Sequence, residues 1–454
     1  MLAWLQNRVN NAHPSTLLLL SYLAAIGIGT LFLLLPVSTS GGDFPLIDAL
    51  FTATSAVCVT GLTVVDTGTA FTRFGQGVIL VLIQIGGLGI MTLSVALFQL
   101  IGKRIVFQQR MAMQEVFSHT PRRDIYLLVR SVFVFTFMVE AAGALLLFFY
   151  WRTDYSFSAS LYLSVFHSVS AFCNAGFALF NNSFMDAGDS VYLNLTVGGL
   201  IVLGGIGFPV VYEVFRRMTR REKGKTSLQV KTVLAVTAGL IAAGMLVIIV
   251  SERSLIPSVG FKQGVLAAFF QSVTCRTAGF NTLDIASLNT ATLLFMMFLM
   301  LVGASPGSCG GGIKTTTLAV LAAFSWNRLK HHKCTNLFGK TIPQDTVNRS
   351  ISVLLFSLAA VCLAVFLLLF LDPDHGVRVG GQRQFLSYLF EIVSAFGTVG
   401  LSMGVTPLLT WSGKLIIIAL MIIGRVGVPV FTYIIAGGES TKGIQYAEEN
   451  MMIG

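Results

Sequence analysis

Charged residues are scarce in this sequence. Asp, Glu, Lys and Arg together make up 11% of its 454 residues, whereas soluble globular domains contain about 25%. Hydrophobic residues make up 54%, and the mean hydropathy is +0.79. This composition excludes a chain of several soluble domains and places most of the residues in lipid. We therefore expect a single all-α bundle in which each membrane crossing takes roughly 20 apolar residues.

Cysteines are few and show no paired spacing. The sequence has no CxxC pair and no spacing that is typical of a zinc site. We therefore expect neither a disulfide framework nor a metal centre, and we interpret the cysteines as small core residues. They are Cys58, Cys173, Cys275, Cys309, Cys334 and Cys362.

The beginning of the sequence lacks the features of a cleavable signal peptide. Its first apolar run, residues 15–36, is longer than the apolar region of such a peptide, and no A-x-A cleavage site follows it. We expect this run to stay in place as the first membrane helix.

A continuous basic stripe is also missing, although the formal net charge is +10. Lys and Arg fall into three short clusters between apolar spans, which argues against nucleic-acid binding. The positive-inside rule assigns such clusters to cytoplasmic loops. Both termini are then cytoplasmic, and the Asp-bearing loops between the clusters are external. The clusters cover residues 103–123, 216–231 and 328–349.

The sequence does contain a fourfold repeat. Each unit has a long helix, an external loop, a short amphipathic helix, a glycine-bearing turn and a second long helix. The units are 1–101, 102–225, 226–333 and 334–454. The long outer helices are expected at 15–36, 125–150, 230–250 and 349–371, and the inner helices at 74–101, 190–216, 289–327 and 412–436.

This repeat predicts an all-α integral membrane protein with eight transmembrane helices around a central quasi-fourfold pore. The short helices have about 12 residues each, which is too few to cross a bilayer, so they must dip in and return. Non-helical backbone at that depth is tolerated only inside protein or along water. A central pore meets that condition for all four units.

The four short helices align without gaps. An aromatic residue stands ten positions before each glycine: Phe51, Phe166, Phe269 and Phe390. A bulky apolar residue follows each glycine: Leu62, Phe177, Phe280 and Leu401. Three units carry a Ser-Ala pair at matched positions, and the third unit has Val273 and Thr274 there.

The turns after the short helices are the candidate ion-binding site. Small or β-branched residues leave the backbone carbonyl groups free to point inward, and glycine reaches the φ values that this can require. Rings of carbonyl oxygens replace the hydration shell of potassium in ion filters, and the helices direct their negative ends at the ion. The alternative is that these glycines are helix breaks or packing contacts. The turns are Cys58, Val59, Thr60, Gly61; Cys173, Asn174, Ala175, Gly176; Arg276, Thr277, Ala278, Gly279; and Gly397, Thr398, Val399, Gly400.

The inner helices carry a second repeated feature, a short glycine-rich stretch that we call the glycine mark. It begins at Gly86, Gly204, Gly303 and Gly424, at a nearly constant distance from the turn glycine. We expect it near the middle of the membrane.

The third inner helix contains a run that cannot stay helical, because Pro and repeated Gly disfavour the helix interior. We interpret it as a loop that gates the pore below the turns; a packing kink is the alternative. The run is Gly303, Ala304, Ser305, Pro306, Gly307, Ser308, Cys309, Gly310, Gly311, Gly312, Ile313 and Lys314. Lys314 can face either the pore or the cytoplasm.

Arg425 replaces the small residue that the other inner helices have at the same position. Charges at that depth are costly and are usually functional. We interpret Arg425 as an electrostatic barrier to cations, with a structural role as the alternative. Three other ionisable residues, Glu140, His167 and Glu391, are interpreted as structural, and the expected partner of Glu140 is an Arg or a backbone group.

Two unrelated function classes fit less well. A conventional secondary transporter is expected to have inverted repeats and ionisable residues in broken helices, whereas these repeats all run the same way. An intramembrane enzyme could use the serines near Gly303, but no His or Lys partner stands in a recognisable motif.

The turn and loop motifs together resemble the Trk/Ktr/HKT superfamily of potassium transporters, most of all the KtrB-type membrane subunits, from about residue 15 to the end. The resemblance implies potassium selectivity, because no filter glycine is replaced by the serine of sodium-preferring members. It also implies gating by the 303–314 loop and a pore arginine at Arg425. The filter glycines that it identifies are Gly61, Gly176, Gly279 and Gly400.

The resemblance further implies a homodimer in the plasma membrane, a cytosolic KtrA-like nucleotide-binding ring and stimulation by Na⁺. The basic loops contain no phosphate-binding glycine motif, so this chain is expected to bind K⁺ but no organic cofactor. The channel-like subunit of an ATP-driven potassium pump is the alternative function. Such subunits are usually longer, and no phosphorylation motif is present here.

Overall fold

The computed structural model describes residues 14–89, 125–220, 226–253, 260–371 and 381–427. The basic cluster 103–123, the predicted end of the first inner helix at 90–101 and both chain termini lie outside the described residues.

Four long helices are each long and apolar enough to cross a membrane. Only 22–28% of their most apolar windows is buried within the protein, and large apolar side chains such as Phe32, Phe149 and Phe370 are exposed. Exposed apolar surface on this scale is expected where lipid, and not water, surrounds the helices. The long helices are α2 (Pro14–Leu33), α8 (Ile125–Trp151), α12 (Leu228–Ser251) and α17 (Gln344–Leu371).

A short, buried helix follows each long one. These helices contain 12, 16, 14 and 17 residues, so the predicted length of about 12 is right for the first of them and too short for the other three. We call them the pore helices. They are α3 (Leu46–Val57), α9 (Phe157–Phe172), α14 (Phe261–Thr274) and α18 (Gly381–Gly397).

An inner helix completes each unit. The four are α5 (Arg73–Leu88), α10 (Val191–Ile206), α15 (Thr290–Leu301) and α19 (Trp411–Val426). The third is interrupted where the sequence predicts, because α15 ends at Leu301 and α16 (Thr315–Leu329) begins only after the 303–314 run.

The predicted single helix at 190–216 is wrong. Gly207 has φ +94°, a left-handed conformation that ends α10, and α11 (Phe208–Arg220) leaves at an angle of 96° to it. Pro209 stands near the start of α11, where a proline is compatible with a new helix but not with a continuing one. Gly207 and Pro209 are therefore the sequence signals for this break.

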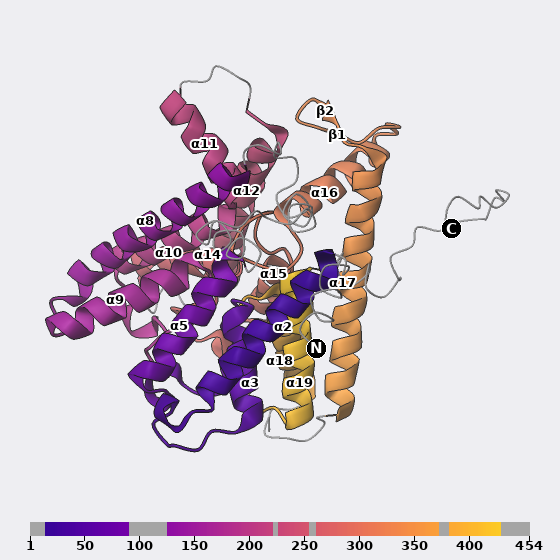
Figure 1. The fold of residues 1–454 in the computed structure, drawn as a ribbon. Coiled ribbons are helices and arrows are strands. Elements are labelled where there is room, and N and C mark those ends of the chain that lie inside the picture. The colour runs from indigo at the N-terminus through magenta and orange to yellow at the C-terminus, as the bar shows by residue number, and fades with distance from the viewer. Residues whose placement is uncertain (1–13, 90–124, 221–225, 254–259, 372–380, 428–454) are drawn as a thin grey trace, which may run out of the picture.

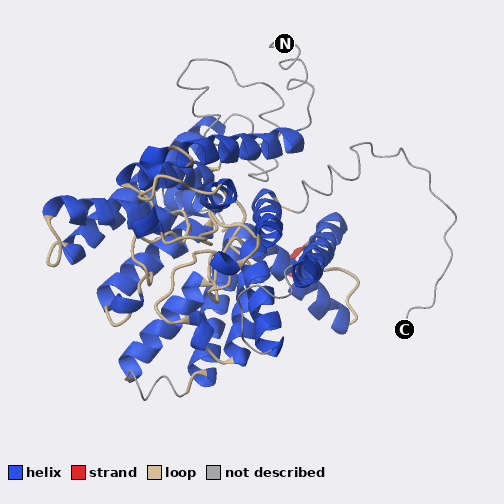
Figure 2. Ribbon diagram, turned by 90° about the horizontal axis from the view of Figure 1, so that it is seen from below, coloured by secondary structure: helices blue, strands red, loops and turns tan. Residues whose placement is uncertain are grey.

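The four units are arranged in a closed ring. Each inner helix contacts the pore helix of the next unit: α5 contacts α9, α10 contacts α14, and α15 contacts α18. The fourth inner helix, α19, contacts the first pore helix, α3, and the two lie side by side (Figure 1). Viewed at right angles, the connecting loops gather in the middle of the helices (Figure 2).

The remaining elements are short. A small antiparallel hairpin pairs β1 (Asn336–Leu337) with β2 (Lys340–Thr341). The connections contain α4 (Thr67–Ala70), η1 (Pro36–Ser38), η2 (Met185–Ala187), η3 (Ile285–Ser287) and η4 (Thr406–Leu408). By length and hydropathy alone, four described helices can cross a membrane, or five if α10 and α11 form one span, so the number eight stays a prediction.

Candidate functional site: four glycine turns above an intramembrane loop

The four turns share an unusual backbone. Each glycine has a positive φ, between +70° and +92°, and so does the non-glycine residue two positions before it, between +50° and +70°. A non-glycine residue held in this region costs about 1–3 kcal/mol and persists only where the surroundings impose it. The same strain therefore occurs at four equivalent places. The residues are Val59 and Gly61, Asn174 and Gly176, Thr277 and Gly279, and Thr398 and Gly400.

Hydrogen bonds hold the N–H groups of the turns back against the pore helices. The N–H of Thr60 donates to the carbonyl of Ser55 at 2.8 Å, and the N–H of Gly61 donates to the hydroxyl of the same serine at 3.1 Å. Val399 and Gly400 bond to Ser394 with the same two distances. The serine of the repeated Ser-Ala pair thus holds the turn.

The second and third turns are held in related ways. The N–H of Ala175 donates to the carbonyl of Ser170 at 2.7 Å, and the N–H of Ala278 donates to that of Thr274 at 2.9 Å. The hydroxyl groups of Ser170 and Thr274 donate instead to the carbonyl oxygens of Phe177 and Phe280. Within the described part of the chain, nothing donates to the carbonyl oxygens of Thr60, Ala175, Ala278 and Val399.

The glycines close the turns into a ring. A side chain on Gly61 would stand 2.5 Å from the carbonyl oxygen of Ala175, and one on Gly176 would stand 2.8 Å from that of Ala278. Gly279 lies in the same way against Val399, and Gly400 lies against Thr60 of the first turn. Each glycine thus lies against an unbonded carbonyl of the next turn, and the fourth turn meets the first.

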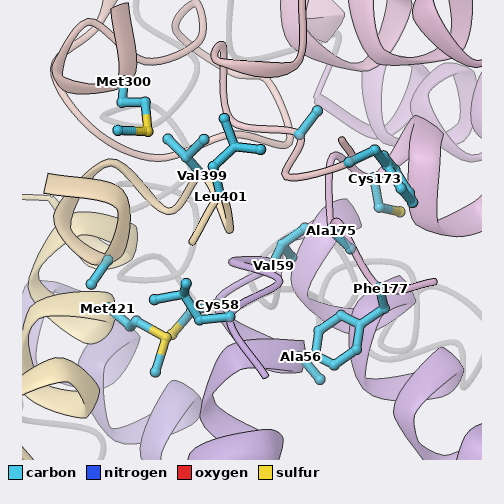
Figure 3. Close-up of a cluster of buried hydrophobic side chains, with 14 of the residues drawn as sticks. Ala56, Cys58, Val59, Cys173, Ala175, Phe177, Met300, Val399, Leu401 and Met421 are labelled. Atoms are coloured by element: carbon cyan, nitrogen blue, oxygen red, sulfur yellow. The ribbon is translucent and has the colours of Figure 1, made fainter. Parts of the chain in front are cut away.

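A tightly packed core surrounds this ring. The bulky residues after the glycines are at most 1% exposed: Leu62, Phe177, Phe280 and Leu401. Figure 3 shows Val59, Ala175 and Val399 from three different turns close together, with Cys58 beside Met421 of α19. All six cysteines are free, and four of them are buried as predicted, whereas Cys334 and Cys362 are exposed.

The glycine mark of the inner helices lies where these helices approach the pore helices. A side chain on Gly86, Gly204 or Gly424 would collide with the carbonyl oxygen of Val57, Phe172 or Phe396, near the end of each pore helix. The left-handed residues Gly89, Gly207 and Gly427 then end α5, α10 and α19. Glycine is needed at these positions for close approach and for helix termination.

The 303–314 run forms a loop directly against the turns. The N–H of Gly311 donates to the hydroxyl of Thr398 at 2.9 Å, and a side chain on Gly310 would collide with the hydroxyl of Thr277. The hydroxyl of Thr277 in turn donates to the side-chain oxygen of Asn174 at 3.2 Å. Residues two positions before the glycines therefore connect the loop to three of the four units.

Backbone hydrogen bonds attach the loop to the ends of its neighbours. The N–H groups of Ser305 and Cys309 donate to the carbonyl oxygens of Gly205 (3.1 Å) and Gly204 (3.2 Å). The N–H of Gly312 donates to Gly424, and the N–H of Phe208, the first residue of α11, donates to Gly307 at 2.9 Å. Ala304, Ser305 and Cys309 are at most 1% exposed.

Two cations belong to this loop region. The guanidinium of Arg425 donates to the carbonyl oxygens of Cys309 in the loop and Gly86 at the end of α5. Lys314 folds back on the loop, because its ammonium group donates to the carbonyl of Gly310 at 2.7 Å.

The other buried ionisable residues have structural partners. The carboxylate of Glu391 accepts hydrogen bonds from Thr406 (2.8 Å) and Met403 (3.2 Å) in the loop after the fourth turn. His167 Nε2 accepts from the N–H of Leu179 at 3.1 Å. Glu140 was expected to face an Arg or a backbone group, and its carboxylate instead accepts from Gln84 of α5 at 3.3 Å.

One link was missed by sequence reasoning. Lys414 at the start of α19 forms an ion pair of 2.6 Å with Asp48 in the first turn of α3, and so joins the fourth unit to the first. A signal was present, since Asp48 and Lys414 are the first charged residues of two elements that must be adjacent if four units close into a ring.

The chain is similar to known cation transport proteins. Residues 4–440 match the sequence model of the TrkH family, described as cation transport proteins. The chain belongs to the TrkH family. This TrkH-family chain is 40% identical to the Ktr system potassium uptake protein B of Bacillus subtilis, and the alignment covers 97% of both proteins.

Two further TrkH-family relatives are similar over nearly their full length. They are the Ktr system potassium uptake protein B of Vibrio alginolyticus, 37% identical over 96% of this chain and 94% of the relative, and the potassium/sodium uptake protein NtpJ of Enterococcus hirae, 36% identical over 97% of both. The crystal structure of the potassium transporter TrkH from Vibrio parahaemolyticus has the same fold, with a TM-score of 0.69, 19% identity and coverage of 93% of this chain and 84% of that one.

Proposed function

We propose that this chain is a membrane subunit for potassium uptake and that K⁺ passes through the ring of four glycine turns. The observation that carries the proposal is the contact of each left-handed glycine with an unbonded carbonyl oxygen of the next turn, in an order that closes on itself. Carbonyl oxygens arranged around an axis replace the water that a potassium ion loses. The names of the relatives support potassium as the ion.

In this proposal the sixteen turn residues form the selectivity filter, with the glycines Gly61, Gly176, Gly279 and Gly400 at the ion. The four units 1–101, 102–225, 226–333 and 334–454 surround the pore with eight crossings of the plasma membrane, and both termini lie in the cytoplasm. The pore helices end at the turns, so their negative dipole ends favour a cation there.

The 303–314 loop is the gate in this proposal. It contacts the turns through Thr398 and Thr277, on the side that we propose faces the cytoplasm, and Arg425 adds a fixed positive charge beside it. Hydrogen bonds to glycine carbonyls at the helix ends hold the loop in place. The proposed gate opens when these bonds break. Potassium then follows its electrochemical gradient into the cell.

A partner and a second ion complete the proposal. The Ktr-system names of the relatives support a second subunit, which we propose is a cytosolic KtrA-like nucleotide-binding ring, docked on a homodimer of this chain. The name of the Enterococcus relative supports a role for Na⁺ as well.

The test is growth of a bacterium that lacks its own potassium uptake systems, on low-potassium medium, with this gene alone and with the gene of its partner. Growth in either case is expected. Failure of both, with normal amounts of the protein in the membrane, contradicts potassium uptake.

A further inference from the structure

The third filter turn contains a buried arginine, Arg276. It stands three positions before Gly279 and is 5% exposed. The equivalent positions of the other turns hold Cys58, Cys173 and Gly397, none of which carries a fixed charge. Arg276 is therefore the one cationic residue of the four turns, and nothing in the repeat requires it there.

No described group neutralises this charge. The Nε and Nη2 atoms of Arg276 are buried without a hydrogen-bond partner, and no described carboxylate forms an ion pair with the side chain. Arg425 differs, because its guanidinium donates to two carbonyl oxygens. A buried charge without a partner is strongly unfavourable, and in a membrane such a residue usually has a function.

Arg276 is also close to the ion path. Three residues of extended chain span at most about 11 Å, so its backbone lies within that distance of Gly279. The interaction between two buried charges is stronger than in water, because the dielectric constant of the protein is low. Salt also screens buried charges much less than exposed ones. A fixed positive charge carried by this turn raises the free energy of a cation in the filter.

We propose that Arg276 is a positioned charge that weakens potassium binding in the filter and so speeds release of the ion. Four turns with free carbonyl oxygens and four helix ends all favour a cation. Conduction, however, requires that the ion be bound weakly enough to leave. Arg276, within the third turn, opposes these attractions. The inference rests on the proposed function.

The test uses the purified full-length chain in proteoliposomes and measures the KM and the maximal rate of potassium uptake. Two neutral variants, Arg276→Gln and Arg276→Met, are expected to lower KM about tenfold, the effect of a unit charge at about 10 Å in protein, and to lower the maximal rate. Arg276→Lys keeps the charge and is expected to keep KM within about twofold of wild type. Arg152→Gln removes an exposed arginine just after α8, outside the four turns, and is the matched control; it is expected to leave KM unchanged because water and salt screen its charge.

The outcomes separate this inference from the proposed function. If wild type and Arg152→Gln take up no potassium, the proposed function fails. If they do, and the neutral variants leave KM unchanged or raise it, Arg276 does not tune ion binding. If neither neutral variant gives monodisperse protein while Arg276→Lys does, the charge serves the fold and the proposal is overturned.

Discussion

The guanidinium of Arg425 donates a hydrogen bond to the carbonyl oxygen of Cys309, and this contact joins the end of α19 to the loop at 303–314. A second bond from the same side chain reaches Gly86, so one residue of the fourth unit holds both the loop of the third unit and the inner helix of the first. Arg425 is thus a mechanical link as well as a charge. In the proposed function, both properties oppose ion flow while the bonds last.

Removal of this link should increase flow. Arg425→Ala deletes the charge and both hydrogen bonds, and we expect potassium flux in proteoliposomes to rise at least tenfold. Each charge-assisted bond of this kind contributes about 1.5–3 kcal/mol, and about 1.4 kcal/mol corresponds to a factor of ten. Arg425→Lys separates the two effects, because it keeps the charge but cannot form a fork of two bonds. An unchanged or lower flux in Arg425→Ala indicates a structural arginine.

The bond between Thr398 and Gly311 gives a second prediction for the loop. Thr398→Val keeps the shape of the side chain but leaves the buried N–H of Gly311 without a partner, at a cost of about 1–3 kcal/mol to the closed arrangement. We expect a higher basal flux, measured as ⁸⁶Rb⁺ uptake. Thr398→Ser keeps the hydroxyl and is the control. Equal fluxes in both variants mean that the bond does not hold the loop.

Gly400 tests the filter itself. Gly400→Ser places a side chain against the carbonyl oxygen of Thr60 and about 3.0 Å from the Cα atom of Gly61, at φ +92°. The first and fourth turns must move apart, and we expect the preference for K⁺ over Na⁺ to fall by about tenfold, the equivalent of 1.4 kcal/mol. Flux of both ions is measured in the same vesicles.

The chain offers a matched control for that variant. Gly404 has φ +85°, yet nothing lies within 4 Å of the side chain that it lacks. Gly404→Ser introduces similar backbone strain without the contact between turns, so its selectivity should equal that of wild type. If both variants lose selectivity to a similar extent, the loss comes from backbone strain and not from the contact between the turns.

Much of the arrangement could be predicted from the sequence because the repeat is local. The spacing from Phe51 to Gly61 recurs in all four units, and it predicts that a short helix, a turn and a second helix follow one another in each. The interruption after Leu301 was predicted from its Gly and Pro residues, since their effect on a helix does not depend on distant contacts.

Contacts between units were harder to predict. The bond from Arg425 to Cys309 joins residues of two different units, and no local pattern encodes it. The bend at Gly207 was missed because apolar residues continue across it, so hydropathy predicts one span where the backbone changes direction. The predicted partner of Glu140 was wrong for a related reason. Its observed partner, Gln84, becomes a neighbour only when α5 packs beside the second unit.

The most direct measurement of whether four glycine turns form one potassium filter is competition for ⁸⁶Rb⁺ uptake into proteoliposomes that contain the purified chain. We predict that unlabelled K⁺ abolishes uptake at concentrations at which Na⁺ has little effect, and that this difference shrinks in Gly279→Ser as much as in Gly400→Ser, because both glycines lie in the same ring. Equal competition by Na⁺ and K⁺ in the wild-type chain would contradict the account.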